Sequence, residues 1–130
     1  MDCPNCGTGM VAFAVSADLR DCLPGEEPGA ALCPRCLELE PVGDPPADPP
    51  DFTRIGDAFP EEPEAAVPMA LLVGLVSSLA LYRSEVETLL AHVERAGVDS
   101  LLVLDRLAVQ GSIETDTDLR GRRTQLEQLL

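Results

Sequence analysis

Two cysteine pairs with the same spacing constrain the front of this chain more than any other feature. They are Cys3-Pro4-Asn5-Cys6-Gly7 and Cys33-Pro34-Arg35-Cys36, and 26 residues lie between them. Zinc binds four cysteine thiolates tetrahedrally, and such a set leaves no coordination position open for water or substrate. A proline fixes φ at the start of each turn, and Gly7 can adopt a positive φ. The spacing therefore predicts one structural Zn²⁺ bound by Cys3, Cys6, Cys33 and Cys36.

Other roles for these thiols fit the pattern less well. A rubredoxin-like iron site uses two Cys-x-x-Cys-Gly loops, but Leu37 stands where the second glycine would be, and Phe13 is the only aromatic residue before Phe52. A thioredoxin-type redox site needs one such pair at the start of a helix in a βαβ unit. Disulfides are disfavoured because the cysteines number five and no secretory signal precedes Cys3.

Cys22 is the fifth cysteine and has no partner at ligand spacing. A small, partly buried side chain is its expected role. The alternative is a reactive thiol, which the neighbouring Asp21 disfavours because a negative charge opposes thiolate formation.

The chain is strongly acidic: 23 acidic and 9 basic residues give a formal net charge of −14, and every basic residue is an arginine. Repulsion among like charges destabilises a compact state, but at molar salt the Debye length is only about 3 Å and the repulsion largely vanishes. We therefore expect a salt-accumulating host and a cytoplasmic location. An ordinary acidic mesophilic protein is the alternative.

The same charge argues against nucleic acid as the partner. Residues 1–40 contain seven acidic residues and two arginines, and four thiolates around one zinc ion add about −2. Phosphate binding requires cationic side chains and weakens steeply with salt.

The first 40 residues predict a zinc ribbon. Residues 10–15 alternate so that Val11, Phe13 and Val15 share one strand face. Residues 30–32 and 37–40 predict two further short strands. A unit of about 40 residues rarely buries enough core to fold alone, so we expect metal binding and folding of residues 1–40 to be one event.

Residues 41–63 predict an acidic, proline-rich linker, because seven of the twelve prolines lie there. Phe52, Ile55 and Phe59 interrupt it at helical spacing. We expect this apolar patch to dock on the chain's own helices. The alternative is a short motif that a partner's groove would bind.

Residues 65–82 carry no charge and predict a buried central helix. Their length is at the lower limit for a membrane span, but Pro68 and Gly74 interrupt the run, and Arg83 as the only flanking cation would place the ribbon outside the cytoplasm. Four small residues form a stripe where another helix could approach: Ala70, Gly74, Ser77 and Ser78.

Three further helices complete a helical domain over residues 64–130. Ser84-Glu85-Val86-Glu87 has the pattern of a capping box, and Gly97 ends that helix. Asp99 caps the next helix, which Gly111 ends. The last helix carries Leu119, Leu126, Leu129 and Leu130. The predicted fold class is α+β: a small N-terminal β zinc ribbon, the linker, and a C-terminal antiparallel bundle of about four helices.

No residue set in the sequence predicts catalysis. The single histidine, His92, has no nucleophile at catalytic spacing, and we expect a solvated helix residue. Arg120, Arg122 and Arg123 form the one basic cluster. A solvated helix face is the expected role, and contact with an acidic partner or phosphate is the alternative.

Taken together, the chain resembles a small uncharacterised haloarchaeal family, a domain of unknown function with an N-terminal zinc ribbon. The resemblance covers most of the length and includes both cysteine pairs. The other segments that carry it are Asp57-Ala58-Phe59-Pro60, Leu71 to Arg83, Ala96-Gly97-Val98-Asp99, Leu101 to Leu107, and Gln125 to Leu130. It implies a halophilic host and a zinc site, and it supplies no activity.

The sequence thus favours a non-catalytic zinc-binding protein that acts as a protein-interaction or adaptor module in a halophile cytoplasm. We expect a protein partner, and neither nucleic acid nor a membrane. A transcription-associated or nucleic-acid-related zinc ribbon is the alternative, and a redox or metal-handling role through Cys22 and the two pairs ranks third.

Overall fold

The predicted α+β fold class is confirmed by the computed structural model, which describes residues 1–23 and 25–130. A three-stranded antiparallel sheet contains β1 (Val11–Ala14), β2 (Gly29–Leu32) and β3 (Leu39–Val42), with β2 in the middle. The helices are α1 (Pro63–Leu75), α2 (Arg83–Arg95), α3 (Ser100–Ala108) and α4 (Leu119–Glu127). Short 3₁₀ turns, Arg20–Cys22, Phe52–Arg54 and Val76–Ser78, lie between them.

The sheet places alternate side chains of β1 in the core, as its sequence pattern predicts. Val11 pairs with Leu32 and Phe13 with Ala30, and all four residues are buried. The third strand begins at Leu39, two residues later than the sequence predicts. The reason is that Leu37 belongs to the turn of the second cysteine pair and has a left-handed backbone, with φ of 66°, which a strand cannot contain.

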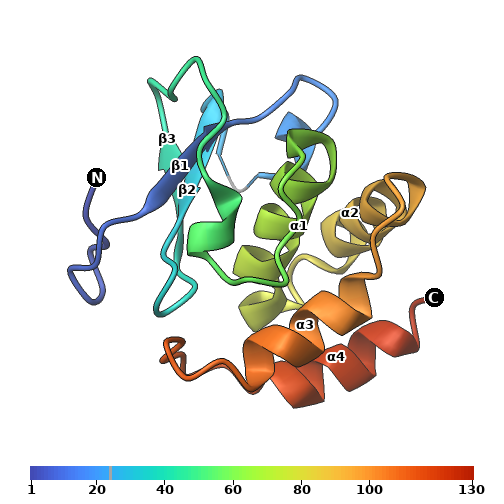
Figure 1. The fold of residues 1–130 in the computed structure, drawn as a ribbon. Coiled ribbons are helices and arrows are strands. Elements are labelled where there is room, and N and C mark those ends of the chain that lie inside the picture. The colour runs from blue at the N-terminus through green and yellow to red at the C-terminus, as the bar shows by residue number, and fades with distance from the viewer. Residues whose placement is uncertain (24) are drawn as a thin grey trace.

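Helix α1 lies between the sheet and α2 and is the centre of the fold (Figure 1). Ten of its thirteen residues are buried, so it is apolar all the way round. It differs from the predicted 65–82 helix: it begins at Pro63, continues through Pro68 and Gly74, the residues predicted to interrupt it, and ends at Leu75, where a 3₁₀ turn follows. Over the described residues, no helix has the length and apolar character that crossing a membrane requires.

The close approach at Gly74 involves a strand and not the helix that the stripe of small residues predicts. A Cβ added at Gly74 would lie 2.6 Å from the Cβ of Leu39 in β3. The other end of the stripe, Ser77 and Ser78, is exposed. Gly74 therefore lets β3 pack directly on α1.

The apolar patch of the linker docks inside the molecule. Phe52, Ile55 and Phe59 are buried, and the rings of Phe52 and Phe59 stack with centroids 6.4 Å apart. Phe52 also contacts Phe13 of β1, with ring centroids 5.7 Å apart, so the patch packs on the sheet as well as on the helices. The division into 1–40, 41–63 and 64–130 stays a prediction, while one hydrophobic core extends through all three segments.

Two of the predicted helix-end signals hold, at Asp99 and Gly97, whereas α3 ends at Ala108 and not at the predicted stop, Gly111. The Asp99 carboxylate caps α3 by accepting a hydrogen bond from the N–H of Leu102 at 3.1 Å. Beyond α2, Gly97 has φ of 84°, and the N–H groups of Gly97 and Val98 donate to the carbonyls of Glu94 and Val93. These two bonds form a Schellman motif.

The predicted capping box at Ser84 is wrong. Helix α2 begins at Arg83, so its N-cap is Tyr82, two residues before the predicted one, and no side chain caps the helix. Ser84 is therefore already helical, and its carbonyl accepts a hydrogen bond from the Thr88 hydroxyl.

Helices α3 and α4 pack together beside the C-terminal end of α1 (Figure 1). Asp118 caps α4 by accepting from the N–H of Gly121 at 3.1 Å. The Nε of Arg123 in α4 lies 3.0 Å from the Asp105 carboxylate in α3, and this ion pair joins the two helices. In the predicted basic cluster Arg120 is exposed, whereas Arg122 and Arg123 are half-buried, so a fully solvated face describes Arg120 alone.

Candidate metal centre

The fold brings the four predicted cysteine ligands together. Their sulfur atoms all lie within 4.8 Å of one another. The Sγ atoms of Cys3 and Cys36 are 3.5 Å apart, as are those of Cys6 and Cys33. Four sulfurs at 2.3 Å from a tetrahedral zinc ion would be separated by about 3.8 Å, whereas a disulfide would require about 2.05 Å. The arrangement fits a four-thiolate metal site, and all four cysteines are free.

The first cysteine pair lies on a turn outside the sheet, which we call knuckle 1 (residues 3–7). The N–H of Gly7 donates to the carbonyl of Cys3, and the N–H of Cys3 donates to the carbonyl of Thr8, both at 2.8 Å. Gly7 has φ of 79°, which glycine adopts without steric cost. The N–H of Asn5 lies 3.4 Å from the Cys3 sulfur and can stabilise a thiolate there.

The second pair repeats this hydrogen-bond pattern in knuckle 2 (residues 33–37). The N–H of Leu37 donates to the carbonyl of Cys33 at 3.0 Å, and the N–H of Cys33 donates to the carbonyl of Glu38 at 2.9 Å. The N–H groups of Arg35 and Cys36 each lie 3.4 Å from the Cys33 sulfur. Leu37 occupies the position of Gly7 with a positive φ of 66°. The missing second glycine therefore does not change the turn.

The two knuckles differ in exposure. Cys3 and Cys33, the first cysteine of each pair, are 3% and 0% exposed. The second cysteines are more accessible: Cys36 is half-buried and Cys6 is exposed. Leu37 is buried in the main core, whereas Gly7 is exposed. Knuckle 2 is thus anchored in the molecule, and knuckle 1 meets solvent over most of its length.

The surroundings also shift the thiol pKa values in opposite directions. Hydrogen bonds from the hydroxyl and backbone of Thr8 lower the pKa of Cys6 to about 6. Burial raises the pKa of Cys36 to about 12 and also raises the pKa of Cys33. A bound cation favours deprotonation of every ligand. Cys6 is therefore ready to bind a metal as a thiolate, while Cys33 and Cys36 need the metal in order to ionise.

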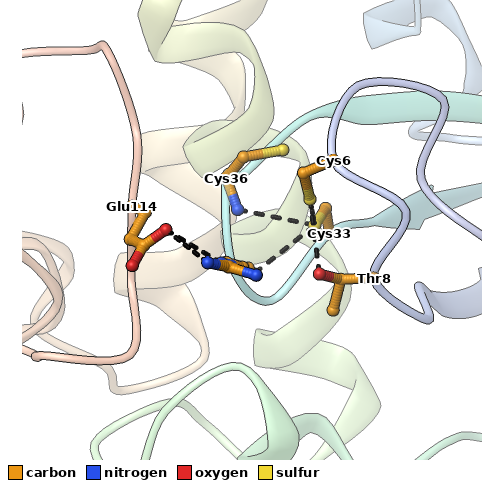
Figure 2. A network of polar contacts seen from close by, with 6 residues as sticks. Cys6, Thr8, Cys33, Cys36 and Glu114 are labelled. Carbon is orange, nitrogen blue, oxygen red and sulfur yellow. Dashed lines mark hydrogen bonds and ion pairs between the residues drawn. The ribbon is translucent and has the colours of Figure 1, made fainter.

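The loop between α3 and α4 reaches knuckle 2, a contact that sequence reasoning missed. The Arg35 guanidinium donates to the Glu114 carboxylate at 2.6 Å and 3.0 Å, the dashed lines that meet Glu114 in Figure 2. The N–H of Glu114 also donates to the Arg35 carbonyl at 2.6 Å. The two residues are 79 positions apart, and nothing in the local sequence pairs them. The metal site is thereby tied to the helical part of the chain.

The remaining candidates lie away from the four sulfurs. Cys22 is buried in the main core, and burial together with the charges of Glu85, Asp21 and Asp18 raises its pKa. This confirms the expected small buried side chain and opposes a reactive thiol. His92 is half-buried on α2, less solvated than the sequence predicts.

Among the residues that the structure describes, the four cysteines form the one cluster of three or more potential metal ligands. A metal held by all four would have a complete tetrahedral shell and no site for substrate. Such a centre stabilises a fold and does not by itself catalyse a reaction.

Comparison with known proteins adds the family. A family model described as "Family of unknown function (DUF6276)" matches residues 2–130. No curated protein and no solved structure matches the chain.

Proposed function

From the premise that the chain belongs to this family of unknown function, DUF6276, we propose that it is a non-catalytic zinc-binding protein that serves as a protein-interaction or adaptor module. The observation that carries the proposal is the set of four cysteine sulfurs within 4.8 Å of one another. Zinc is the ion that we assign, since four thiolates at this spacing suit its tetrahedral preference. The ion holds the two knuckles in place and takes no part in a chemical reaction.

The exposure of knuckle 1 supports an interaction role. Pro4, Asn5 and Cys6 are exposed at its tip, and the metal fixes them in one conformation. A rigid, exposed turn loses little conformational entropy on binding a partner. The docked apolar patch Phe52, Ile55 and Phe59 is excluded as the contact surface because its side chains are buried.

We further propose that the protein works in the cytoplasm of a salt-accumulating cell. Its net charge of −14 over 130 residues produces self-repulsion that molar salt would screen. The same charge favours a protein partner over nucleic acid, which requires cationic neutralisation of phosphates.

The interaction role is tested by affinity purification of the full chain from a high-salt lysate of a halophile that encodes it. A stoichiometric protein partner is expected with the wild type and should be lost when the tip is altered by Asn5→Arg. Because the Asn5 side chain also hydrogen-bonds Cys36, the zinc content of both proteins is measured and should be equal. Arg120→Gln, on the exposed face of α4, is the matched control. Binding to DNA or RNA at low salt with no protein partner would replace the proposal with the nucleic-acid alternative.

A further inference from the structure

A second feature of the molecule is a cleft beside α4 that the metal centre does not use. It lies between residues 79–83 and the C-terminal half of α4 with the residues that follow it, and has a volume of about 350 Å³. This is within the range of small-molecule sites, roughly 300–1,000 Å³. The cleft is lined by Leu79, Arg83, Arg122, Gln125, Gln128 and Leu129, together with Ala80.

The charge of the cleft is opposite to that of the whole protein. Two arginines line it, and over the described part of the chain no acidic residue does. The chain has 23 acidic and 9 basic residues, so a cleft with cations and no lining carboxylate is unexpected from composition. Such a pocket concentrates anions.

Arg122 is held in place by contacts that leave its charge uncompensated. Its guanidinium donates to the Gln125 amide oxygen at 3.0 Å and to the Ser77 carbonyl at 3.5 Å. Its Nε is buried and has no hydrogen-bond partner among the described residues. A buried donor without a partner costs free energy, and no carboxylate of the described residues is paired with the Arg122 guanidinium.

Arg83 is the second cation and is more loosely engaged. Its Nε lies 3.6 Å from the Glu87 carboxylate, and the side chains of both residues are about half or more exposed. An exposed pair at this distance contributes little, so Arg83 can turn to a ligand at small cost. Gln125 and Gln128 add amide donors for the same anion.

The rest of the cleft is apolar. Leu79 is buried, with 8% of its surface exposed, and Leu129 is half-buried and packs against the main core. Part of the Leu129 side chain is in contact with water, and a ligand with a short hydrocarbon chain would cover it, whereas a bare inorganic anion would not.

We propose that this cleft binds a small amphipathic anion, with a carboxylate or phosphate group on Arg122 and Arg83 and an apolar chain against Leu79 and Leu129. Arginine is suited to both groups because its planar fork donates two parallel hydrogen bonds. The site is separate from the four cysteines and does not depend on the proposed interaction role.

The test is calorimetric titration of the zinc-loaded full chain, at the lowest KCl concentration at which circular dichroism shows it fully folded, with octanoate, octyl phosphate and the neutral octanamide. At least one of the two anions should bind saturably, and at least about tenfold more tightly than octanamide, because charge-assisted hydrogen bonds are lost with the neutral head. The anion that binds more tightly identifies the headgroup. Equal affinity for octanamide, or the absence of binding by both anions, would overturn the proposal.

Variants locate the site. Arg122→Gln should lower the affinity for the preferred anion about tenfold, and Arg83→Gln should lower it by a smaller factor. Arg120→Gln, an exposed arginine of the same helix that does not line the cleft, should leave affinity unchanged. Methyl NMR shifts of Leu79 and Leu129 on titration give a readout that survives if Arg122→Gln perturbs folding. The assignment would be contradicted if Arg120→Gln weakened anion binding as much as Arg122→Gln does, or if only methyl groups outside the cleft shifted on titration.

Discussion

Knuckle 1 and knuckle 2 have the same backbone hydrogen bonds and supply the same ligands, but they lie in different surroundings. Knuckle 1 has a glycine at its left-handed position and is exposed. Knuckle 2 has Leu37 there, buried in the core, and is joined to the α3–α4 loop through Glu114. The comparison indicates that knuckle 2 is packed more firmly into the fold than knuckle 1.

The largest effect is expected from removing a buried ligand of knuckle 2. Cys33→Ala should abolish tight zinc binding and unfold the sheet region, because zinc binding contributes about 10–16 kcal/mol in small zinc domains. Cys6→Ala removes an exposed ligand from knuckle 1 and should lose zinc while leaving β2 and β3 more protected from hydrogen exchange than Cys33→Ala does. Cys22→Ala is the control that keeps zinc. Equal protection in the two ligand variants would remove the proposed difference between the knuckles.

Replacing Leu37 should have the next largest effect on the free energy of unfolding. Leu37→Ala keeps the strained left-handed backbone and loses a buried side chain, which should lower the free energy of unfolding by about 2–4 kcal/mol. Leu37→Gly loses the same packing but removes a backbone strain of about 1–2 kcal/mol, so it should be the less destabilised variant. Urea denaturation of the zinc-loaded proteins measures the difference. The opposite order would show that Leu37 is unstrained.

Gly7→Ala tests the same strain in knuckle 1. No atom lies within 4 Å of an added Cβ, so the cost should come from the positive φ of 79° alone. We expect a loss of about 1–2 kcal/mol in urea denaturation, smaller than that of Leu37→Ala. A loss equal to or larger than that of Leu37→Ala would mean that knuckle 1 is as firmly built into the fold as knuckle 2.

The opposite pKa shifts in the knuckles predict how zinc binding depends on pH. The pKa of Cys6 is lowered to about 6. Above this pH the Cys6 thiolate already exists, whereas below it zinc must displace one more proton. Zinc binding should therefore release about one proton more at pH 5 than at pH 7.5, and affinity should fall more steeply with acid below pH 6. Calorimetry in buffers of different ionisation enthalpy counts the protons. Thr8→Val, which removes the hydroxyl beside Cys6, should shrink the difference.

The smallest effect is expected at the link between knuckle 2 and the helices. The side chains of Arg35 and Glu114 are 49% and 64% exposed, and exposed ion pairs contribute about 0–1 kcal/mol. Glu114→Gln should therefore change stability by less than 1 kcal/mol, yet it should raise hydrogen exchange in residues 109–118. Glu127→Gln, which removes an ion pair within α4, is the control. Unchanged exchange in the loop would show that the backbone bond to Arg35 suffices.

Most of the metal site could be predicted from the sequence, because cysteine spacing reflects coordination geometry directly. The first two strands, Gly97 and the Asp99 cap could also be predicted, since each depends on a few neighbouring residues. The third strand was misplaced at 37–40 because the left-handed turn at Leu37 has no local signal when glycine is absent.

Features that depend on distant residues could not be read from local patterns. Phe52 contacts Phe13 of the sheet, and Gly74 faces Leu39, although in each case the two residues lie more than thirty positions apart. The predicted cap at Ser84 is wrong although its signal is local, because α2 begins at Arg83 and the motif lies inside the helix.

The closed thiolate centre on which the account depends is tested most directly by X-ray absorption at the zinc edge of the purified full chain. The account predicts one zinc ion per chain with four sulfur neighbours at about 2.3 Å and no oxygen or nitrogen in the first shell. A shell with fewer than four sulfurs and a light-atom ligand, or a preparation that contains no zinc, would contradict it.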